Sequence, residues 1–294
     1  MVVLKEKKIG YQLYYYLEHS MKMDGIVVKK EVYLGKDKPN NLDELKKDFM
    51  HELFIEKYKK DLEKIKKAFS KEYSSYPKSA KEKYIENFMI KFTYDTQRIE
   101  GSTLTLKETA NLLEDGISPS KPIKDVKEAE THKKVFFEMM NHKDGLNLKT
   151  IIYWHKLLFE ETDLEIAGKI RKHPVAVARS KSEFPLGAEL DYLLRDFFKW
   201  YNKVKNKLNP VELASLVHLK FVSIHPFSDG NGRLSRLMMN FVLHKYKYPM
   251  LNIEYSNRNS YYNALERAQV KHIDYVFTQY LIKRYLKMYT KHLS

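Results

Sequence analysis

The stretch 209–243 constrains the fold most, because it specifies two helices and the tight loop that separates them. Asn209 offers a side-chain cap and the proline after it fits the first helical position, so we expect a helix over residues 210–224. That helix must end there, since Pro226 excludes the residue before it from the α-helical region. After a short polar loop, the apolar run at 237–243 predicts a second helix.

Helical periodicity continues through most of the chain. Gly101 is expected to cap the end of one helix, and Thr105 with Glu108 forms a capping box that opens the next. Further helices are expected from residue 42 to about residue 69, and at about 80–100, 125–142 and 148–160. The sequence therefore predicts a mainly α-helical fold.

Two segments depart from this helical pattern. Residues 8–34 are rich in Tyr and Val with alternating faces, and Asp24-Gly25 between the two runs is a turn signal, so we expect a β-hairpin. Residues 173–186 lose helical periodicity around an extended Val-Ala-Val stretch. This second segment predicts a short hairpin or flap.

The net charge and the absence of cysteine limit the classes of function. Lys and Arg exceed Asp and Glu by 53 − 38 = 15, but basic and acidic residues interleave, which is typical of a solvated surface. With no Cys, the chain has no disulfide, thiolate metal site or cysteine nucleophile. No apolar run reaches the roughly 18 residues of a membrane span, and the charged N-terminus does not resemble a signal peptide. We expect a soluble cytoplasmic protein.

The loop inside the stretch 209–243 has the composition of an anion-binding site. Gly230 and Gly232 let consecutive backbone N–H groups curl around an anion, and the start of the following helix adds free donors. Arg233 and Arg236 lie three residues apart, so their guanidinium groups share one helix face and can grip phosphate oxygens.

Two further residues of this loop add chemistry to phosphate binding. Asp229 supplies a hard oxygen ligand for Mg²⁺ (or Mn²⁺) bridging phosphates. His225 is suited to general-base catalysis, because an ordinary imidazole has a pKa of about 6.5. The loop thus predicts a nucleotide, a divalent metal and a base at one site.

The run from His225 to Arg236, HPFSDGNGRLSR, matches every specified position of HPFx[DE]GNGRxxR and so resembles the signature of the Fic family. The resemblance covers residues 145–285, with one further element upstream. It implies a Fic-type helical core with a small β-hairpin flap. The N-terminal β-hairpin and the helices over 1–80 lie outside the resemblance, and more helices are expected over 81–144. It also implies protein adenylylation, in which AMP passes from ATP to a Ser, Thr or Tyr hydroxyl and pyrophosphate is released.

The resemblance also implies a role for each residue of the signature. His225 would take the proton of the attacking hydroxyl, and Asp229 would hold the metal on the α- and β-phosphates of ATP. Arg233 would stabilise charge on the pyrophosphate, and Arg236 would hold the γ-phosphate. Phe227 is expected to bury its ring and anchor the loop. The phosphates would be cradled by the other residues of this segment: Gly230, Asn231, Gly232, Leu234 and Ser235.

Two other segments resemble Fic elements that contact the nucleotide or the target. Residues 260–269 resemble the helix that lines the adenine and ribose pocket, with Tyr261 and Gln269 facing the nucleotide, although many relatives have Asn at the latter position. Residues 168–171 and the stretch after them resemble the flap, whose free edge can pair with an extended target segment. The flap residues are Val175, Ala176, Val177 and Ala178.

Thr96, Glu100 and Gly101 fit the pattern [ST]xxxE[GN], which resembles the inhibitory motif of Fic proteins that carry their own regulatory helix. At the end of a helix, Glu100 can pair with Arg236 and occupy the guanidinium that the γ-phosphate of ATP needs. Because the motif precedes the signature in the same chain, the resemblance is to the class with an N-terminal inhibitory helix. We therefore expect an autoinhibited enzyme.

Other functions stay open at the level of sequence. Some Fic relatives transfer other phosphate-containing groups, and Glu100 could position a water that removes AMP from a modified protein. Outside the enzyme class, the alternative is a nucleotide-sensing regulator that binds nucleic acid. The expected partners are ATP and a target protein at the flap edge, with the N-terminal region recruiting a target or partner. Self-modification and a homo-oligomer remain open, the latter through apolar residues such as Phe136, Phe137 and Met140.

Overall fold

The N-terminal segment forms a three-stranded antiparallel sheet in the order β1-β2-β3, with strands β1 (Val3–Ile9), β2 (Gln12–Met23) and β3 (Ile26–Gly35). The structure is a computed structural model that describes residues 2–23, 25–175 and 182–293. The expected hairpin is present as β2 and β3, but sequence analysis missed β1 and wrongly extended the hairpin through Gly10. That glycine has a φ of 62° and lies in the turn between β1 and β2.

The chain divides into two units, residues 1–63 and 64–294, and helix α1 (Leu42–Ser75) crosses this boundary. In the first unit, one face of the sheet is apolar and packs on the start of α1. Leu17 of β2 is fully buried there, in a cluster with Val2, Phe49 and Leu53. Removal of these side chains from water stabilises the packing of the sheet on the helix.

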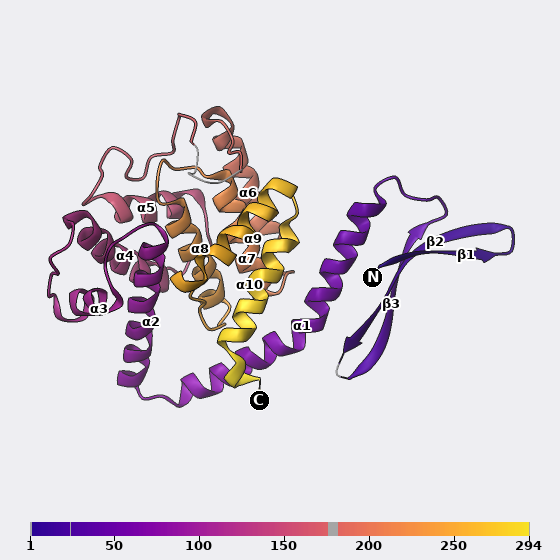
Figure 1. Cartoon of the computed structure of the whole chain (residues 1–294), viewed down its shortest axis with the longest axis horizontal. Helices are drawn as coiled ribbons and strands as arrows, with labels where there is room; N and C mark the ends of the chain where they lie inside the picture. The colour runs from indigo at the N-terminus through magenta and orange to yellow at the C-terminus, as the bar shows by residue number, and fades with distance from the viewer. Residues whose placement is uncertain (1, 24, 176–181, 294) are drawn as a thin grey trace. The chain divides into compact units, whose positions relative to one another are not determined.

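The second unit is helical, which confirms the predicted mainly α-helical fold (Figure 1). Its longer helices are α2 (Lys78–Ile99), α3 (Leu106–Asp115), α4 (Ile123–Asn141), α5 (Leu148–Phe159), α6 (Leu190–Val204), α7 (Pro210–Ile224), α8 (Asn231–Lys245), α9 (Arg258–Lys271) and α10 (Asp274–Met288). Short 3₁₀ turns lie at Gly187–Glu189, Tyr255–Asn257 and Thr290–His292.

The predicted helix ends are confirmed by hydrogen bonds. Thr105 and Glu108 form the expected capping box at the start of α3. The Asn209 side chain accepts from the N–H of Val211 and so caps α7. α2 ends just before Gly101, whose φ of 101° is a conformation that glycine adopts at little cost.

Helix α8 lies at the centre of this unit, in contact with α7, α4, α5 and α2. From Arg233 to Leu243 every residue of α8 is buried. A helix buried on all sides must bring any polar side chain it carries into the interior. Arg233 and Arg236 are therefore inside the protein, and the start of α8 is fixed by its surroundings.

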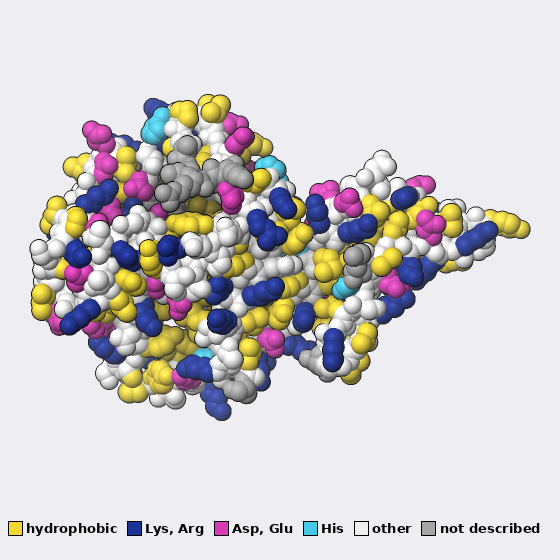
Figure 2. All heavy atoms as spheres, in the orientation of Figure 1, with side chains coloured by type: hydrophobic (Ala, Val, Ile, Leu, Met, Phe, Trp, Pro, Cys, Tyr) yellow, Lys and Arg dark blue, Asp and Glu magenta, His cyan; other side chains and the backbone are white. Residues whose placement is uncertain are grey.

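The predicted flap lies largely outside the described residues, since Ala176, Val177 and Ala178 fall in the gap at 176–181. Among the described residues, those on either side of the gap, 171–175 and 182–186, form no strand. None of the described helices has the length and apolar character needed to cross a membrane. On the face seen in Figure 2, Lys and Arg side chains are scattered among Asp and Glu, as the sequence indicated.

The start of α8 yields a test of the fold. Gly230 precedes α8 with a φ of 77°, and a Cβ built on it would lie 2.5 Å from the Phe159 ring. Gly230→Ala should lower the free energy of unfolding by at least about 2 kcal/mol, because it adds both backbone strain and overpacking. Urea unfolding followed by tryptophan fluorescence measures this, since Trp154 and Trp200 are the only tryptophans of the chain.

The matched control is Gly145→Ala. Gly145 has an ordinary φ, and its Cβ would meet only the flexible end of Lys205, 4.0 Å away. We expect a change within about 0.5 kcal/mol for this variant. Equal effects of the two substitutions would contradict the account of how α8 begins.

Candidate active site

The loop between α7 and α8 is closed by a side chain. Asn231 accepts from the backbone N–H of Phe227 at 3.0 Å and donates to its carbonyl oxygen at 2.8 Å. Phe227 is fully buried, with its ring stacked on that of His155 at 3.7 Å, so it anchors the loop as expected. The Asn231 amide thus holds the loop closed on Phe227.

The N-terminus of α8 is available to an anion. Its cap residue, Gly230, makes no side-chain capping bond, so the first-turn N–H groups have no partner within the helix. Gly232 in this first turn has no side chain, and a Cβ there would collide with the Glu100 carboxylate. The side chains of Leu234 and Ser235 are buried, and the Ser235 hydroxyl donates to the Gly232 carbonyl. Neither side chain is therefore exposed at the N-terminus of α8.

His225 has the hydrogen bonding of a general base. Its Nδ1 lies 3.2 Å from the carbonyl oxygen of Val222. Because a carbonyl only accepts, Nδ1 carries the proton and Nε2 holds the free lone pair. Among the described residues, none bonds to Nε2. Burial, aided by the charge of Arg171, lowers the pKa of His225 below its ordinary 6.5, so the imidazole is neutral at pH 7.

Asp229 is held as a carboxylate. Burial alone would raise its pKa, but the charge of Arg233 and a hydrogen bond from the Gly230 N–H outweigh that effect, so the pKa is lowered. Arg233 lies 3.1 Å from Asp229 Oδ2, and the Asp229 side chain keeps about half of its surface exposed. Its carboxylate is therefore ionised and accessible.

Arg233 has both arms occupied in this structure. Nη2 faces Asp229, Nη1 lies 2.7 Å from Glu128 Oε2 of α4, and the guanidinium sits over the Phe159 ring at 4.7 Å. Sequence analysis did not identify Glu128, since nothing in its local pattern distinguishes it from the surface acids of a helix. Only the packing of α4 on α8 reveals that it pairs with Arg233.

Arg236 is 1% exposed and is paired with Glu100, the carboxylate of the segment that resembles an inhibitory motif. Its Nη2 lies 2.6 Å from Glu100 Oε1, at the C-terminus of α2. The same guanidinium donates to the hydroxyl and to the carbonyl of Thr96, each at 3.3 Å. The structure therefore brings together three sequence-predicted residues from segments 140 positions apart.

Tyr261 lies beneath Arg236 and not at an open surface. It is 1% exposed, and its hydroxyl meets Arg236 Nη1 at 3.3 Å and His218 Nε2 at 3.0 Å. Burial raises the pKa of the Tyr261 phenol. The neighbouring Tyr262, which sequence analysis did not select, donates to the carbonyl of Ile99 at 2.9 Å and so ties α9 to the end of α2.

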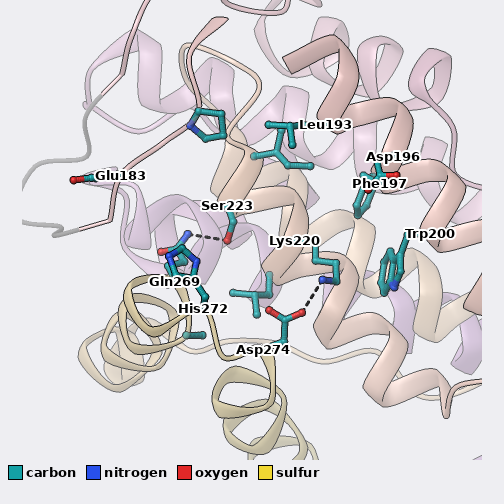
Figure 3. A pocket seen from close by; sticks show the side chains of 14 residues that line it. Glu183, Leu193, Asp196, Phe197, Trp200, Lys220, Ser223, Gln269, His272 and Asp274 are labelled. Carbon is teal, nitrogen blue, oxygen red and sulfur yellow. Dashed lines mark hydrogen bonds and ion pairs between the residues drawn. The ribbon is translucent and has the colours of Figure 1, made fainter. Parts of the chain in front are cut away.

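Gln269 borders a cavity of about 440 Å³ beside the end of α7. Figure 3 shows its side chain reaching Ser223, and the two are 3.1 Å apart. Its amide oxygen accepts from the hydroxyl of Ser182, 2.8 Å away. Ser182 is the first described residue after the 176–181 gap. Lys220 and Asp274, which line the same cavity, form an ion pair.

His155 of α5 is another residue that sequence analysis missed. Its Nδ1 accepts from the Gly168 N–H at 2.9 Å, so Nε2 carries the proton and donates to the Asp229 carbonyl at 3.0 Å. Burial lowers its pKa to about 4.

Among the described residues, no group of three or more His, Asp or Glu side chains could hold a metal alone. A cation at Asp229 would need oxygens from a ligand.

Comparison with known proteins matches part of this chain to a family. Residues 145–243 match the Fic/DOC family. Protein adenylyltransferase Fic of Aedes aegypti is 33% identical over 202 residues, which cover 65% of this chain and 38% of that protein. The same-named protein of Nematostella vectensis is 32% identical over 214 residues, covering 70% and 48%. The chain thus spans less than half the length of these curated relatives.

Solved structures share the fold. A Fic domain-containing signaling protein from Bacteroides thetaiotaomicron is 28% identical with a TM-score of 0.70, covering 78% of this chain and 95% of that one. Fic-1 from C. elegans is 24% identical with a TM-score of 0.71, covering 87% and 78%. The chain therefore has the mainly helical Fic fold, its residues 145–243 match the Fic/DOC family, and it is related to the protein adenylyltransferases named Fic.

Proposed function

We propose that this chain is a protein adenylyltransferase that moves AMP from ATP to a Ser, Thr or Tyr hydroxyl of a target protein or of itself. The observation that carries the proposal is the arrangement around His225. An imidazole with a free Nε2 adjoins the uncapped N-terminus of α8 within a segment that matches the Fic/DOC family. Base and anion site together suit attack of a hydroxyl on a phosphate.

In the proposed reaction, the target hydroxyl oxygen forms a bond to the α-phosphorus of ATP. The bond from that phosphorus to the oxygen bridging the α- and β-phosphates breaks, and pyrophosphate leaves. The hydroxyl proton passes to Nε2 of His225, which is neutral at pH 7. The first-turn N–H groups of α8, those of Asn231 and Gly232 among them, would hold the phosphate oxygens.

A divalent cation, Mg²⁺ or Mn²⁺, is part of the proposal. Asp229 fits it, because the carboxylate is ionised and half-exposed beside the anion site. A bound cation would neutralise charge on the α- and β-phosphates and supply Lewis acidity. Arg233 lies against the same carboxylate and would offset charge on the leaving pyrophosphate.

The base of the nucleotide is proposed to lie on the Gln269 side of the site, next to the cavity of Figure 3. Tyr261 would not contact the nucleotide but would hold Arg236 in place, because its hydroxyl accepts a hydrogen bond from Arg236 Nη1. The target segment would approach along residues 175–178, of which only Val175 is described.

Autoinhibition is the second part of the proposal. Arg236 is the residue proposed to hold the γ-phosphate, yet its guanidinium is engaged by Glu100 and Thr96. A buried arginine that loses its carboxylate partner is left with an uncompensated charge. If Glu100 moved away, Arg236 would therefore favour another anion as its partner. The γ-phosphate of bound ATP can be that anion.

His225→Ala should reduce AMP transfer by about 10²- to 10⁴-fold, because the proton of the hydroxyl loses its acceptor. ATP affinity should stay within about twofold, since the imidazole contacts the hydroxyl and not the nucleotide. Transfer from α-labelled ATP to target protein measures the rate, and γ-labelled ATP separates adenylylation from phosphorylation. A rate within a factor of two of the parent would remove His225 from the mechanism.

Asp229→Ala should raise the Mg²⁺ concentration needed for half-maximal transfer at least tenfold or abolish transfer, because the loop has no other carboxylate. A magnesium titration of the transfer rate measures this. Asp191→Ala, in the exposed first turn of α6, is the control and should leave the requirement unchanged. An unaltered magnesium curve for Asp229→Ala would disprove the assignment.

Glu100→Gly should raise transfer by freeing Arg236, with a larger effect on kcat than on ATP affinity, because the gain is in the orientation of bound ATP. The double variant with Arg236→Ala should lose this gain, so the two substitutions should be strongly non-additive. Labelled transfer by the four proteins of this cycle provides the measurement. A Glu100→Gly protein no more active than the parent would leave Glu100 without an inhibitory role.

A further inference from the structure

Arg171 is a buried cation that the proposed reaction does not use. It is 3% exposed, and no described carboxylate forms an ion pair with it. Its guanidinium instead donates to three carbonyl oxygens: to His225 at 2.7 Å, to His173 at 2.8 Å and to Pro185 at 2.7 Å. Its backbone N–H donates to the carbonyl of Pro226 at 3.0 Å.

A buried arginine without a carboxylate partner lowers the stability of the fold, so a purely structural role does not explain it. A buried charge without a counter-charge is destabilising, and an apolar side chain of similar size could fill the same space. The planar fork of arginine, however, can bind several carbonyl groups at fixed angles, which an apolar chain cannot do. The three carbonyls that it joins come from either side of the 176–181 gap and from the loop that carries His225.

The backbone at His225 needs this support. His225 has a φ of 51° and a ψ of 57°, the left-handed region that is unfavourable for a residue other than glycine. That conformation costs about 1–3 kcal/mol and persists only where the surroundings enforce it. Two of the bonds from Arg171 reach the carbonyls of His225 and Pro226, on either side of the His225–Pro226 peptide bond.

The ring of His225 is held through the same residue. The Phe184 ring lies against the imidazole, with 4.3 Å between centroids. Phe184 precedes Pro185, whose carbonyl is bound by Arg171. Arg171 thus holds the backbone of His225 directly. It holds the Phe184 ring indirectly, because it binds the carbonyl of Pro185, the next residue in the chain.

We propose that Arg171 is a positioning residue for the base, which holds His225 in its left-handed conformation and keeps Phe184 against the imidazole ring. The proposal rests on the proposed function, since it assigns Arg171 to the same reaction. The unpaired charge has a second effect, because it opposes protonation of the imidazole. The other charged groups that act on the ring, Glu100 of α2 and Asp229 of the loop, favour protonation.

The test compares Arg171→Met, which removes the charge and all donors at similar length, with Arg171→Lys, which keeps the charge. Both are made in the Glu100→Gly chain so that transfer is fast enough to measure. Arg171→Met should lower kcat for AMP transfer at least tenfold with KM for ATP within twofold, and Arg171→Lys should recover part of the loss. Arg195→Met, on the exposed side of α6, is the control and should match its parent.

A second readout does not depend on activity. NMR titration of histidine-labelled protein, with the His225 signal assigned by its loss in His225→Ala, gives the pKa of the imidazole in each variant. Removal of a nearby positive charge stabilises the protonated form, so Arg171→Met should raise this pKa and move the acid limb of the kcat/KM profile to higher pH. Arg171→Lys should leave the pKa near the parent value.

A lower kcat of Arg171→Met with an unchanged His225 titration would overturn the proposal, because it would reduce Arg171 to a structural residue. Transfer within twofold of the parent in Arg171→Met would also overturn it. If Arg171→Met does not fold, Arg171→Lys decides: a kcat more than twofold below the parent with KM for ATP within twofold supports the proposal, and a kcat within twofold of the parent overturns it. If no variant transfers AMP at all, the proposed function fails, and the His225 titration still decides whether Arg171 acts on the imidazole.

Discussion

Two arginines on a helix with no exposed face impose the main constraint on this protein. Arg233 and Arg236 are 2% and 1% exposed, and a carboxylate or another anion beside each one offsets the cost of burying its charge. Arg233 is paired with Glu128 of α4 and with Asp229, and Arg236 is paired with Glu100 at the end of α2. The packing of α2 and α4 around α8 therefore also sets the charge of the site. In the proposed function, Glu100 and the γ-phosphate of ATP compete for Arg236.

Much of the fold followed from local signals. The helix over 210–224, its cap at Asn209 and its end before Pro226 were predictable because each depends on a few neighbouring residues. The contact between Glu100 and Arg236 was also expected, although it spans 136 positions, because two separate motifs suggested it. Strand β1 was missed, since Lys and Glu at most of its positions conceal the alternation of an edge strand.

The residues that support the site were not predictable in the same way. Glu128 and His155 act through contacts that join distant segments, and their local patterns do not differ from those of ordinary helix positions. Arg171 lies in a segment that resembles the flap, but its contact with the loop that carries His225 is revealed only by the packing. Asn231 was expected to face phosphate, but its amide closes the loop on Phe227. A short motif specifies which residues take part, whereas packing determines which atoms remain available for a ligand.

The central claim is that one guanidinium alternates between Glu100 and the γ-phosphate of ATP. The most direct measurement is a pair of crystal structures, of the parent chain and of Glu100→Gly, each with a non-hydrolysable ATP analogue and Mg²⁺. The account predicts that Arg236 stays on Glu100 in the parent and contacts the γ-phosphate in the variant. A parent structure in which Arg236 binds the γ-phosphate while Glu100 keeps its present position would contradict it.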